Sequence, residues 1–179
     1  MRKWNGILTA VMMVLFLAHA IMGSFQLIGA GNVISRTVSY LLAAVIFVHA
    51  LVGAVLTART LKTIRASGAG YFRKNKLFWA GRVSGFAILA FLIFHLTAFS
   101  DRSAPVYRLV PFTAARLATQ LLLILTIAVH VLINVRPAFI TMGVRGHRRW
   151  AADILFVLSV ILLFAALAML IYYLRWNRV

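Results

Sequence analysis

The 179-residue chain contains no cysteine and only two acidic residues, Asp101 and Asp153. Without cysteine, this chain can form no disulfide, no zinc–thiolate site and no cysteine-held iron–sulfur cluster. With two aspartates and no glutamate, a paired-carboxylate active site or a carboxylate-rich metal cage is hard to build. The sequence also has no glycine-rich phosphate loop and no Gly-x-Ser-x-Gly nucleophile elbow. The cysteine-based sites are therefore excluded, and the sequence offers little support for the other common catalytic sites.

Apolar residues dominate what is present. They make up 64% of the chain, and the mean hydropathy is +0.99, whereas soluble domains are roughly half apolar. The composition therefore indicates an integral membrane protein. The net charge of +17 could suggest nucleic acid, but the charges fall in short segments between apolar runs, where loop charge reports membrane orientation. We expect no nucleic-acid partner.

Five apolar runs are each close to the ~20 residues that cross a ~30 Å hydrocarbon layer. They cover residues 7–29, 38–58, 78–99, 114–136 and 151–174. The first run resembles a signal peptide because Ala18-His19-Ala20 mimics a cleavage site, but we expect it to be a retained span. The sequence thus predicts an all-α membrane protein with five transmembrane helices in a single domain, residues 1–179.

The orientation follows from the positively charged residues on the two sides. If the N-terminus is cytoplasmic, thirteen of the nineteen lysines and arginines lie on the cytoplasmic side and six on the other. Cytoplasmic loops carry the excess of positive charge in membrane proteins. We therefore expect the N-terminus to be cytoplasmic and the C-terminus to be on the outer side.

Histidine is distributed unusually along these runs. His19, His49, His95 and His130 fall one in each of the first four, and only His147 lies in an expected loop. An ionisable residue inside a membrane span is a functional-site hypothesis by default. The alternative for any one of them is an imidazole satisfied by a hydrogen bond between helices. Four histidines in four successive spans favour a shared function.

The depths of these histidines define two levels. With a rise of ~1.5 Å per residue, His130 lies about 9 Å and His49 about 14 Å from the cytoplasmic end of its run. On the same scale His19 lies about 18 Å deep and His95 about 25 Å deep. In an up-down bundle of short-looped helices, spans one and three are diagonal to each other, as are spans two and four. Each level therefore holds one diagonal pair of histidines.

Two diagonal histidine pairs suit flat cofactors ligated through iron from both sides. The pattern predicts two bis-histidine haems b in a bundle formed by the first four helices. His49 and His130 would hold the inner haem, and His19 and His95 the outer haem. Arg82 and Arg136, near helix ends, are candidates to pair with haem propionates, although positive-inside bias explains them nearly as well.

Glycines lie four residues after two of these histidines. Gly23 follows His19 and Gly53 follows His49, which leaves space one turn along the ligand's own face, where a porphyrin edge needs room. The alternative is ordinary close packing of membrane helices, for which Gly81-x-x-x-Gly85 also qualifies. The sequence leaves both interpretations open.

The sequence resembles the five-helix, dihaem cytochrome b membrane anchor of succinate:quinone oxidoreductases, the succinate dehydrogenase and fumarate reductase family. Residues 75–95 are similar to that family's third anchor helix, N-x-L-F-x3-R-V-[ST]-G-x9-H. His49-Ala50-x-x-Gly53 resembles the second helix, and His130 with Thr141 and Gly143 resembles the fourth. His19 occupies the ligand position of the first helix, and the fifth helix has no histidine, as in the family. The resemblance covers the whole chain.

The resemblance implies a subunit with no succinate or fumarate chemistry of its own. Such a subunit anchors a flavoprotein carrying FAD and an iron–sulfur subunit to the cytoplasmic face of a bacterial or archaeal cytoplasmic membrane. It passes electrons between them and a membrane quinone, menaquinone being the expected species. The basic loops 59–77 and 137–150 would be the docking surface for these partners, with anionic lipid as the alternative ligand for the same charges.

A quinone site near the outer haem would draw on polar residues of the outer rim. The candidates are Gln26, Ser100, Asp101, Arg102 and Tyr107. Some fumarate reductases of this type use a transmembrane glutamate for compensating proton movement, and this chain has none. Either this proton pathway is missing here, or the enzyme works without it.

Two other interpretations stay open. A cytochrome b subunit of a formate dehydrogenase, hydrogenase or nitrate reductase would also be a multihelix haem anchor, although those families concentrate or space their ligands differently. A haem-free transporter or scaffold would show no haem absorbance and is expected to contain internal repeats, which the sequence lacks.

Overall fold

The computed structural model describes residues 2–30, 36–67, 75–99 and 110–177, and these residues form long α-helices without strands. The helices are α1 (Arg2–Leu27), α2 (Arg36–Ser67), α4 (Lys76–Ala98), α5 (Ala114–Met142) and α6 (His147–Trp176). All five are long and apolar enough to cross a membrane. The predicted all-α fold with five candidate spans is confirmed, and the chain is a multi-pass membrane protein by helix length and hydropathy.

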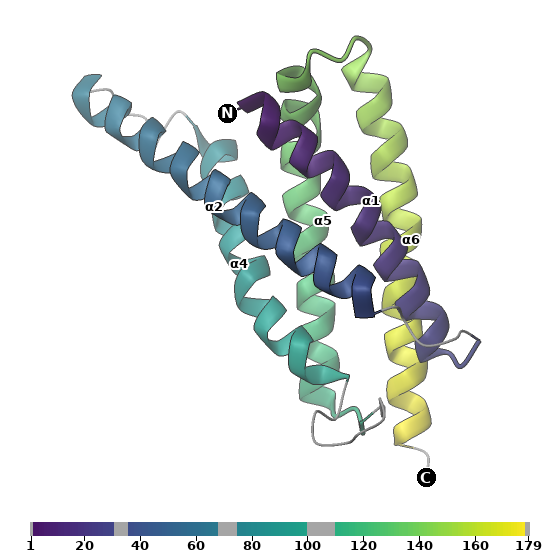
Figure 1. Ribbon diagram of the computed structural model, residues 1–179. Helices are drawn as coiled ribbons and strands as arrows, with labels where there is room; N and C mark the ends of the chain where they lie inside the picture. The colour runs from purple at the N-terminus through teal and green to yellow at the C-terminus, as the bar shows by residue number, and fades with distance from the viewer. Residues whose placement is uncertain (1, 31–35, 68–74, 100–109, 178–179) are drawn as a thin grey trace.

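The helix neighbours follow a simple order (Figure 1). α4 packs along α5, α1 packs along α2, and α1 also contacts α5. α6 packs against both α1 and α5. Within the described residues, α1 with α4, α2 with α4 and α2 with α5 have at most sparse backbone contact. α2 therefore joins the other described helices mainly through α1.

The apolar side chains mostly point away from the protein. Val14, Phe86 and Phe156 are each about 70% exposed, and every helix carries exposed large hydrophobic residues. In water such surfaces would be unstable, but lipid tails are as apolar as the side chains themselves. These surfaces are therefore the lipid contacts of a membrane-spanning chain.

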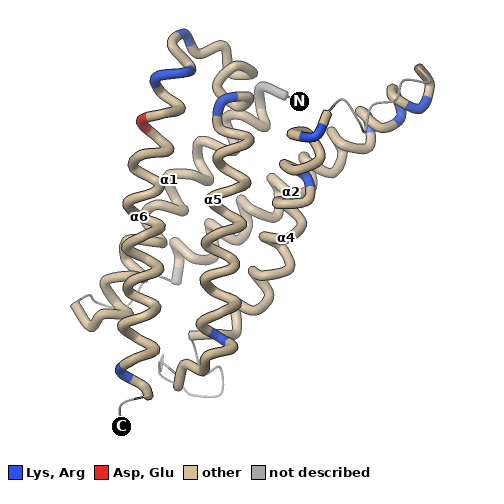
Figure 2. The backbone as a smooth tube through the Cα atoms, turned by 180° about the vertical axis from the view of Figure 1, so that it is seen from behind, with Lys and Arg blue, Asp and Glu red and all other residues tan. Residues whose placement is uncertain are grey.

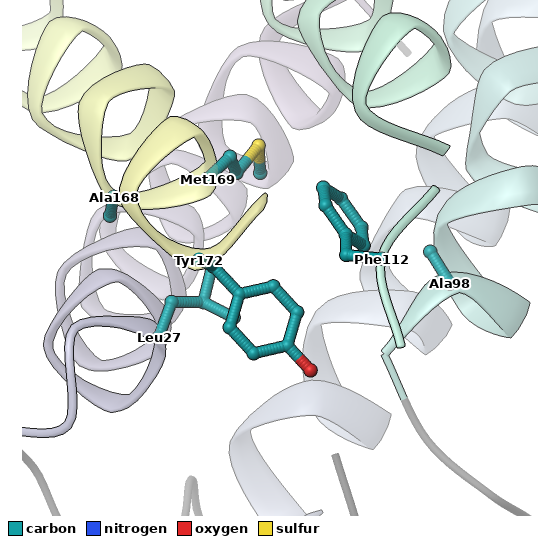
Figure 3. Packing of buried hydrophobic residues seen from close by; sticks show 6 residues of the cluster. All are labelled: Leu27, Ala98, Phe112, Ala168, Met169 and Tyr172. Atoms are coloured by element: carbon teal, nitrogen blue, oxygen red, sulfur yellow. The ribbon is translucent and has the colours of Figure 1, made fainter. Parts of the chain in front are cut away.

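A cluster of buried apolar residues lies at one end of the protein. Its buried residues come from α1, α4, α6 and the segment before α5 (Figure 3), and they are Leu27, Ala98, Phe112, Ala168, Met169 and Tyr172. The Tyr172 hydroxyl donates to the Val110 carbonyl at 2.7 Å, and the Arg175 Nη1 donates to the Ile28 carbonyl at 2.8 Å. This cluster joins the C-terminal end of α6 to the neighbouring helix ends.

The helices extend beyond several predicted spans. An apolar run predicts only the part of a helix that lies in the hydrocarbon layer, whereas local backbone geometry determines where the helix ends. α5 continues through Pro137 to Met142 and stops where Gly143 adopts a left-handed φ of 76°. There the Gly143 N–H donates to the Ile140 carbonyl and the Val144 N–H to the Phe139 carbonyl, each at 3.1 Å. This is a Schellman cap, which favours glycine.

Two expected loops are therefore shorter than predicted. Residues 59–67, the first part of the expected loop 59–77, form the end of α2, which projects beyond the other helices (Figure 1). Of the expected loop 137–150, only residues 143–146 connect helices. His147, predicted to lie in that loop, is instead the first residue of α6 and is half-buried. The left-handed Gly146, with φ of 72°, sets the start of this helix.

Candidate functional site

The four intramembrane histidines come from four different helices. His19 is on α1, His49 on α2, His95 on α4 and His130 on α5, and all four are half-buried. His19 on α1 and His95 on α4 lie close together, although these two helices have at most sparse backbone contact.

The rings of His19 and His95 lie close together in an edge-on arrangement. Their centroids are 6.0 Å apart, and their planes are inclined by 71°. Two imidazoles bound to one metal through bonds of about 2.0–2.1 Å have ring centres roughly 6 Å apart. The separation of this pair therefore fits a shared metal ion between the two rings.

His49 and His130 lie near each other, and Arg82 lies near both. A β-carbon built on Gly53 would lie 3.9 Å from the Arg82 Nη1 atom, so the guanidinium reaches α2 one turn beyond His49. The Arg82 Cζ atom is also 4.9 Å from the centre of the Phe78 ring. The structure thus places one of the two predicted arginines at this histidine pair.

The other predicted residues contribute less. Arg136 is exposed near the end of α5, and Gln26 is half-buried near the end of α1. Ser100, Asp101, Arg102 and Tyr107 lie outside the described residues. The predicted quinone site is therefore represented here by Gln26 alone.

Three of the histidines have their Nδ1 atom engaged by a polar side chain. The partners are Ser39 Oγ for His19 at 3.3 Å, Gln120 Oε1 for His95 at 2.7 Å and Ser84 Oγ for His130 at 3.1 Å. An imidazole that binds a metal through one nitrogen almost always hydrogen-bonds through the other. This arrangement leaves the Nε2 atoms of these three rings as the ligating atoms.

The hydrogen-bond partners fix the proton position in two of the rings. The Gln120 Oε1 atom can only accept, so His95 donates from Nδ1 and keeps its lone pair on Nε2. The Ser84 hydroxyl gives its one hydrogen to the Gly81 carbonyl at 3.1 Å, so it accepts from the His130 Nδ1. Both rings therefore offer Nε2 as an acceptor.

His49 differs from the other three. Its Nδ1 atom is buried and has no hydrogen-bond partner among the described residues. A buried polar nitrogen without a partner costs roughly 1–3 kcal/mol. His49 Nδ1 is thus a polar atom at the His49–His130 pair that has no hydrogen bond within the described part of the chain.

α4 approaches α5 closely beside His130. A β-carbon on Gly85 would lie 3.3 Å from the His130 Cε1 atom, and one on Gly81 would lie 3.1 Å from both side-chain polar atoms of Asn134. The two glycines therefore allow α4 to pack closely against α5, and Gly85 leaves room for the His130 imidazole. For Gly81-x-x-x-Gly85 the close-packing interpretation describes the observed contact.

The number of protein ligands limits the kind of metal site. No three histidine or acidic side chains within the described residues gather around one point. A structural zinc site needs four protein ligands and a catalytic one needs three, so two histidines per level do not suffice. Haem iron takes its remaining ligands from the porphyrin and needs only two axial side chains. The donor set therefore fits haem better than a free metal ion.

Polar partners of the histidines were missed by the sequence analysis. Gln120 and Ser39 were not singled out, and Ser84 was noted only as part of a motif. The available signal was polarity alone, because Gln120 is a glutamine inside the fourth apolar run.

The two ends of the protein differ in their content of positively charged residues. Figure 2 shows lysine and arginine gathered at the end where α2 and α5 finish and α4 and α6 begin. Among the basic side chains that the structure describes, only Arg116 and Arg175 lie at the opposite end. On the packed helices α4 and α5, His130 lies nearer the basic end and His95 nearer the opposite end, by their positions along these helices.

Comparison of the chain with protein-family models, with curated proteins and with solved structures found no match. A functional proposal therefore rests on the arrangement of residues and on the sequence motifs described above.

Proposed function

We propose that this chain is the membrane-anchor and electron-transfer subunit of a succinate dehydrogenase or fumarate reductase complex, and that it holds two haems b. The observation that carries the proposal is the gathering of four histidines from four membrane helices into two pairs. Hydrogen bonds that leave Nε2 free in His95 and His130 support it. The sequence resemblance is the reason for proposing this family and a quinone as electron partner.

Each group has a defined role in this proposal. Haem b, when bound, supplies a one-electron couple at each of the two levels. His49 and His130 would bind the inner haem, and His19 and His95 the outer haem. Ser84 and Gln120 hold the proton of their histidine on Nδ1, which orients the ring and raises its basicity. Arg82 places a positive charge beside the inner pair, where it would neutralise a propionate.

The basic end of the protein is the proposed cytoplasmic side. Positive residues there match the bias expected for cytoplasmic loops. The end of α2 beyond residue 58 and the α5–α6 connection provide a positively charged surface on this side. We propose that an iron–sulfur subunit and a flavoprotein dock on it, next to the inner histidine pair.

Haem stoichiometry tests the proposal directly. The purified chain should contain two b-type haems, measured by a pyridine haemochrome assay against protein concentration. A reduced-minus-oxidised spectrum should show the bands of low-spin haem b. One haem per chain, or none, would contradict the proposal, and the latter would favour a haem-free scaffold or transporter. Co-purification with a flavoprotein and an iron–sulfur subunit then separates this family from other respiratory cytochromes b.

His147 provides a negative test of the ligand assignment. It begins α6 at the basic end, whereas the four paired histidines lie inside the spans. His147→Ala should therefore leave both haems in place and at most weaken docking of the soluble partners. Haem content and co-purification yield measure the two effects. Loss of a haem from a folded His147→Ala protein would overturn both the topology and the ligand assignment.

A further inference from the structure

Gln120 is a fully buried amide in the apolar helix α5, with 0% of its surface exposed. Burying an amide without hydrogen bonds costs several kcal/mol, ~2–7 by transfer scales. Both ends of this amide are engaged, the oxygen by His95 and the nitrogen by Thr119. The side chain is thus held in one orientation by its two partners.

The hydrogen bonds around Gln120 run in one direction. The Thr119 hydroxyl donates to the Arg116 carbonyl at 2.8 Å, so it accepts from the Gln120 Nε2 atom at 3.3 Å. The amide nitrogen therefore faces Thr119, and the amide oxygen faces His95 at 2.7 Å. A flipped amide would set its oxygen against the Thr119 hydroxyl oxygen, whose hydrogen is already donated to the Arg116 carbonyl, so the chain of bonds excludes it.

This chain of bonds begins at a fixed point of the backbone. The Arg116 N–H donates to the Thr113 side chain that caps α5, and Arg116 Nη1 donates to the Pro111 carbonyl at 2.8 Å. The orientation of Gln120 is therefore tied to the first turns of α5. His95, on the neighbouring α4, receives its orientation from a different helix.

We propose that Gln120 is a positioning residue of the outer haem site, which keeps the His95 proton on Nδ1 and thereby lowers the reduction potential of the outer haem. The inference deepens the proposed function and rests on it. An acceptor on the distal nitrogen makes an imidazole a more basic ligand. A more basic ligand stabilises the ferric state relative to the ferrous state, which lowers the potential.

The test compares Gln120→Leu with Gln120→Glu in the full chain with its haems. Leucine has a similar size and removes the acceptor, whereas glutamate retains an oxygen acceptor in either protonation state. Optical redox titration measures both haems, and the wave that His95→Ala removes identifies the outer one. In Gln120→Leu we expect the outer potential to rise, a tenfold change in the ferric-to-ferrous preference being about 59 mV for one electron. Haem affinity at that site should fall about 10–100-fold.

Gln120→Glu should keep the outer haem bound and should not raise its potential. Ser84→Ala is the matched control, because it removes the Nδ1 partner of His130 and should move only the inner wave. An outer shift confined to Gln120→Leu, or selective loss of the outer haem in that variant, supports the inference.

Three results would overturn it: an unmoved outer potential in Gln120→Leu, an equal shift of both haems, or loss of both haems. The last two would mark Gln120 as a structural residue of the α4–α5 contact. Absence of haem from the wild-type chain would defeat the proposed function, and this inference with it. If the wild-type chain binds two haems and Gln120→Leu leaves the potential of the outer haem unchanged, this inference alone is wrong.

Discussion

Replacing His130 with alanine is expected to remove the inner haem and to leave the outer haem spectroscopically intact. His95→Ala should do the reverse. The physical reason is that each level has only two protein ligands, so losing one leaves a haem held by a single histidine. The pyridine haemochrome ratio should fall from two to about one per chain, and one of two waves should disappear from the redox titration.

The two variants differ in the hydrogen bonds that remain around the deleted ring. After His130→Ala, the Ser84 hydroxyl still donates to the Gly81 carbonyl, so no buried donor is orphaned there. After His95→Ala, the buried Gln120 oxygen loses its donor, which costs about 1–3 kcal/mol. His95→Ala should therefore unfold at the lower temperature, and adding Gln120→Leu should restore part of that loss.

The pairing itself is tested by the remaining two ligands. His49→Ala should abolish the same haem as His130→Ala, and His19→Ala the same haem as His95→Ala. If His49→Ala and His95→Ala abolished the same haem, the pairing would be wrong, whatever the total haem content.

The number and type of helices could be predicted from the sequence because a span of ~20 apolar residues has few alternatives in a bilayer. The ends of the helices could not be predicted as well. Polar residues continue a helix past the hydrocarbon layer, as residues 59–67 do in α2, and left-handed glycines such as Gly143 decide where it stops.

The histidines could be found from the sequence, but their partners could not. Counting residues along a helix gives the depth of His95, since the rise per residue is constant. Which side chain meets His95 depends on the rotation of α4 against α5, which packing of the two helices determines. Gln120 is therefore evident as a polar residue in the sequence, while its bond to His95 requires the tertiary structure. Haem ligation stays a prediction at both levels.

Gly85→Leu is expected to remove the inner haem by displacing its ligand. Even a β-carbon at this position would lie 3.3 Å from the His130 Cε1 atom and 3.6 Å from Nδ1, so a leucine side chain must push the ring away from α4. Displacement also breaks the Ser84 hydrogen bond that orients the ring. Overpacking of this kind costs typically 1–3 kcal/mol. Haem content and thermal unfolding measure the two effects.

Two controls separate ligand displacement from general damage to α4. Ala90→Leu adds the same side chain on an exposed part of α4 and should change neither haem content nor stability. Gly81→Ala presses on Asn134, 3.1 Å from the new β-carbon, and should lower stability while the inner haem is retained. If Gly85→Leu kept both haems with an unchanged spectrum, the prediction would be wrong: a His130 ring packed against Gly85 could not then be the ligand of the inner haem. Loss of the inner haem alone would instead show that Gly85 is needed to position His130. The missing side chain at this glycine allows both the close approach of α4 to α5 and the observed place of the imidazole.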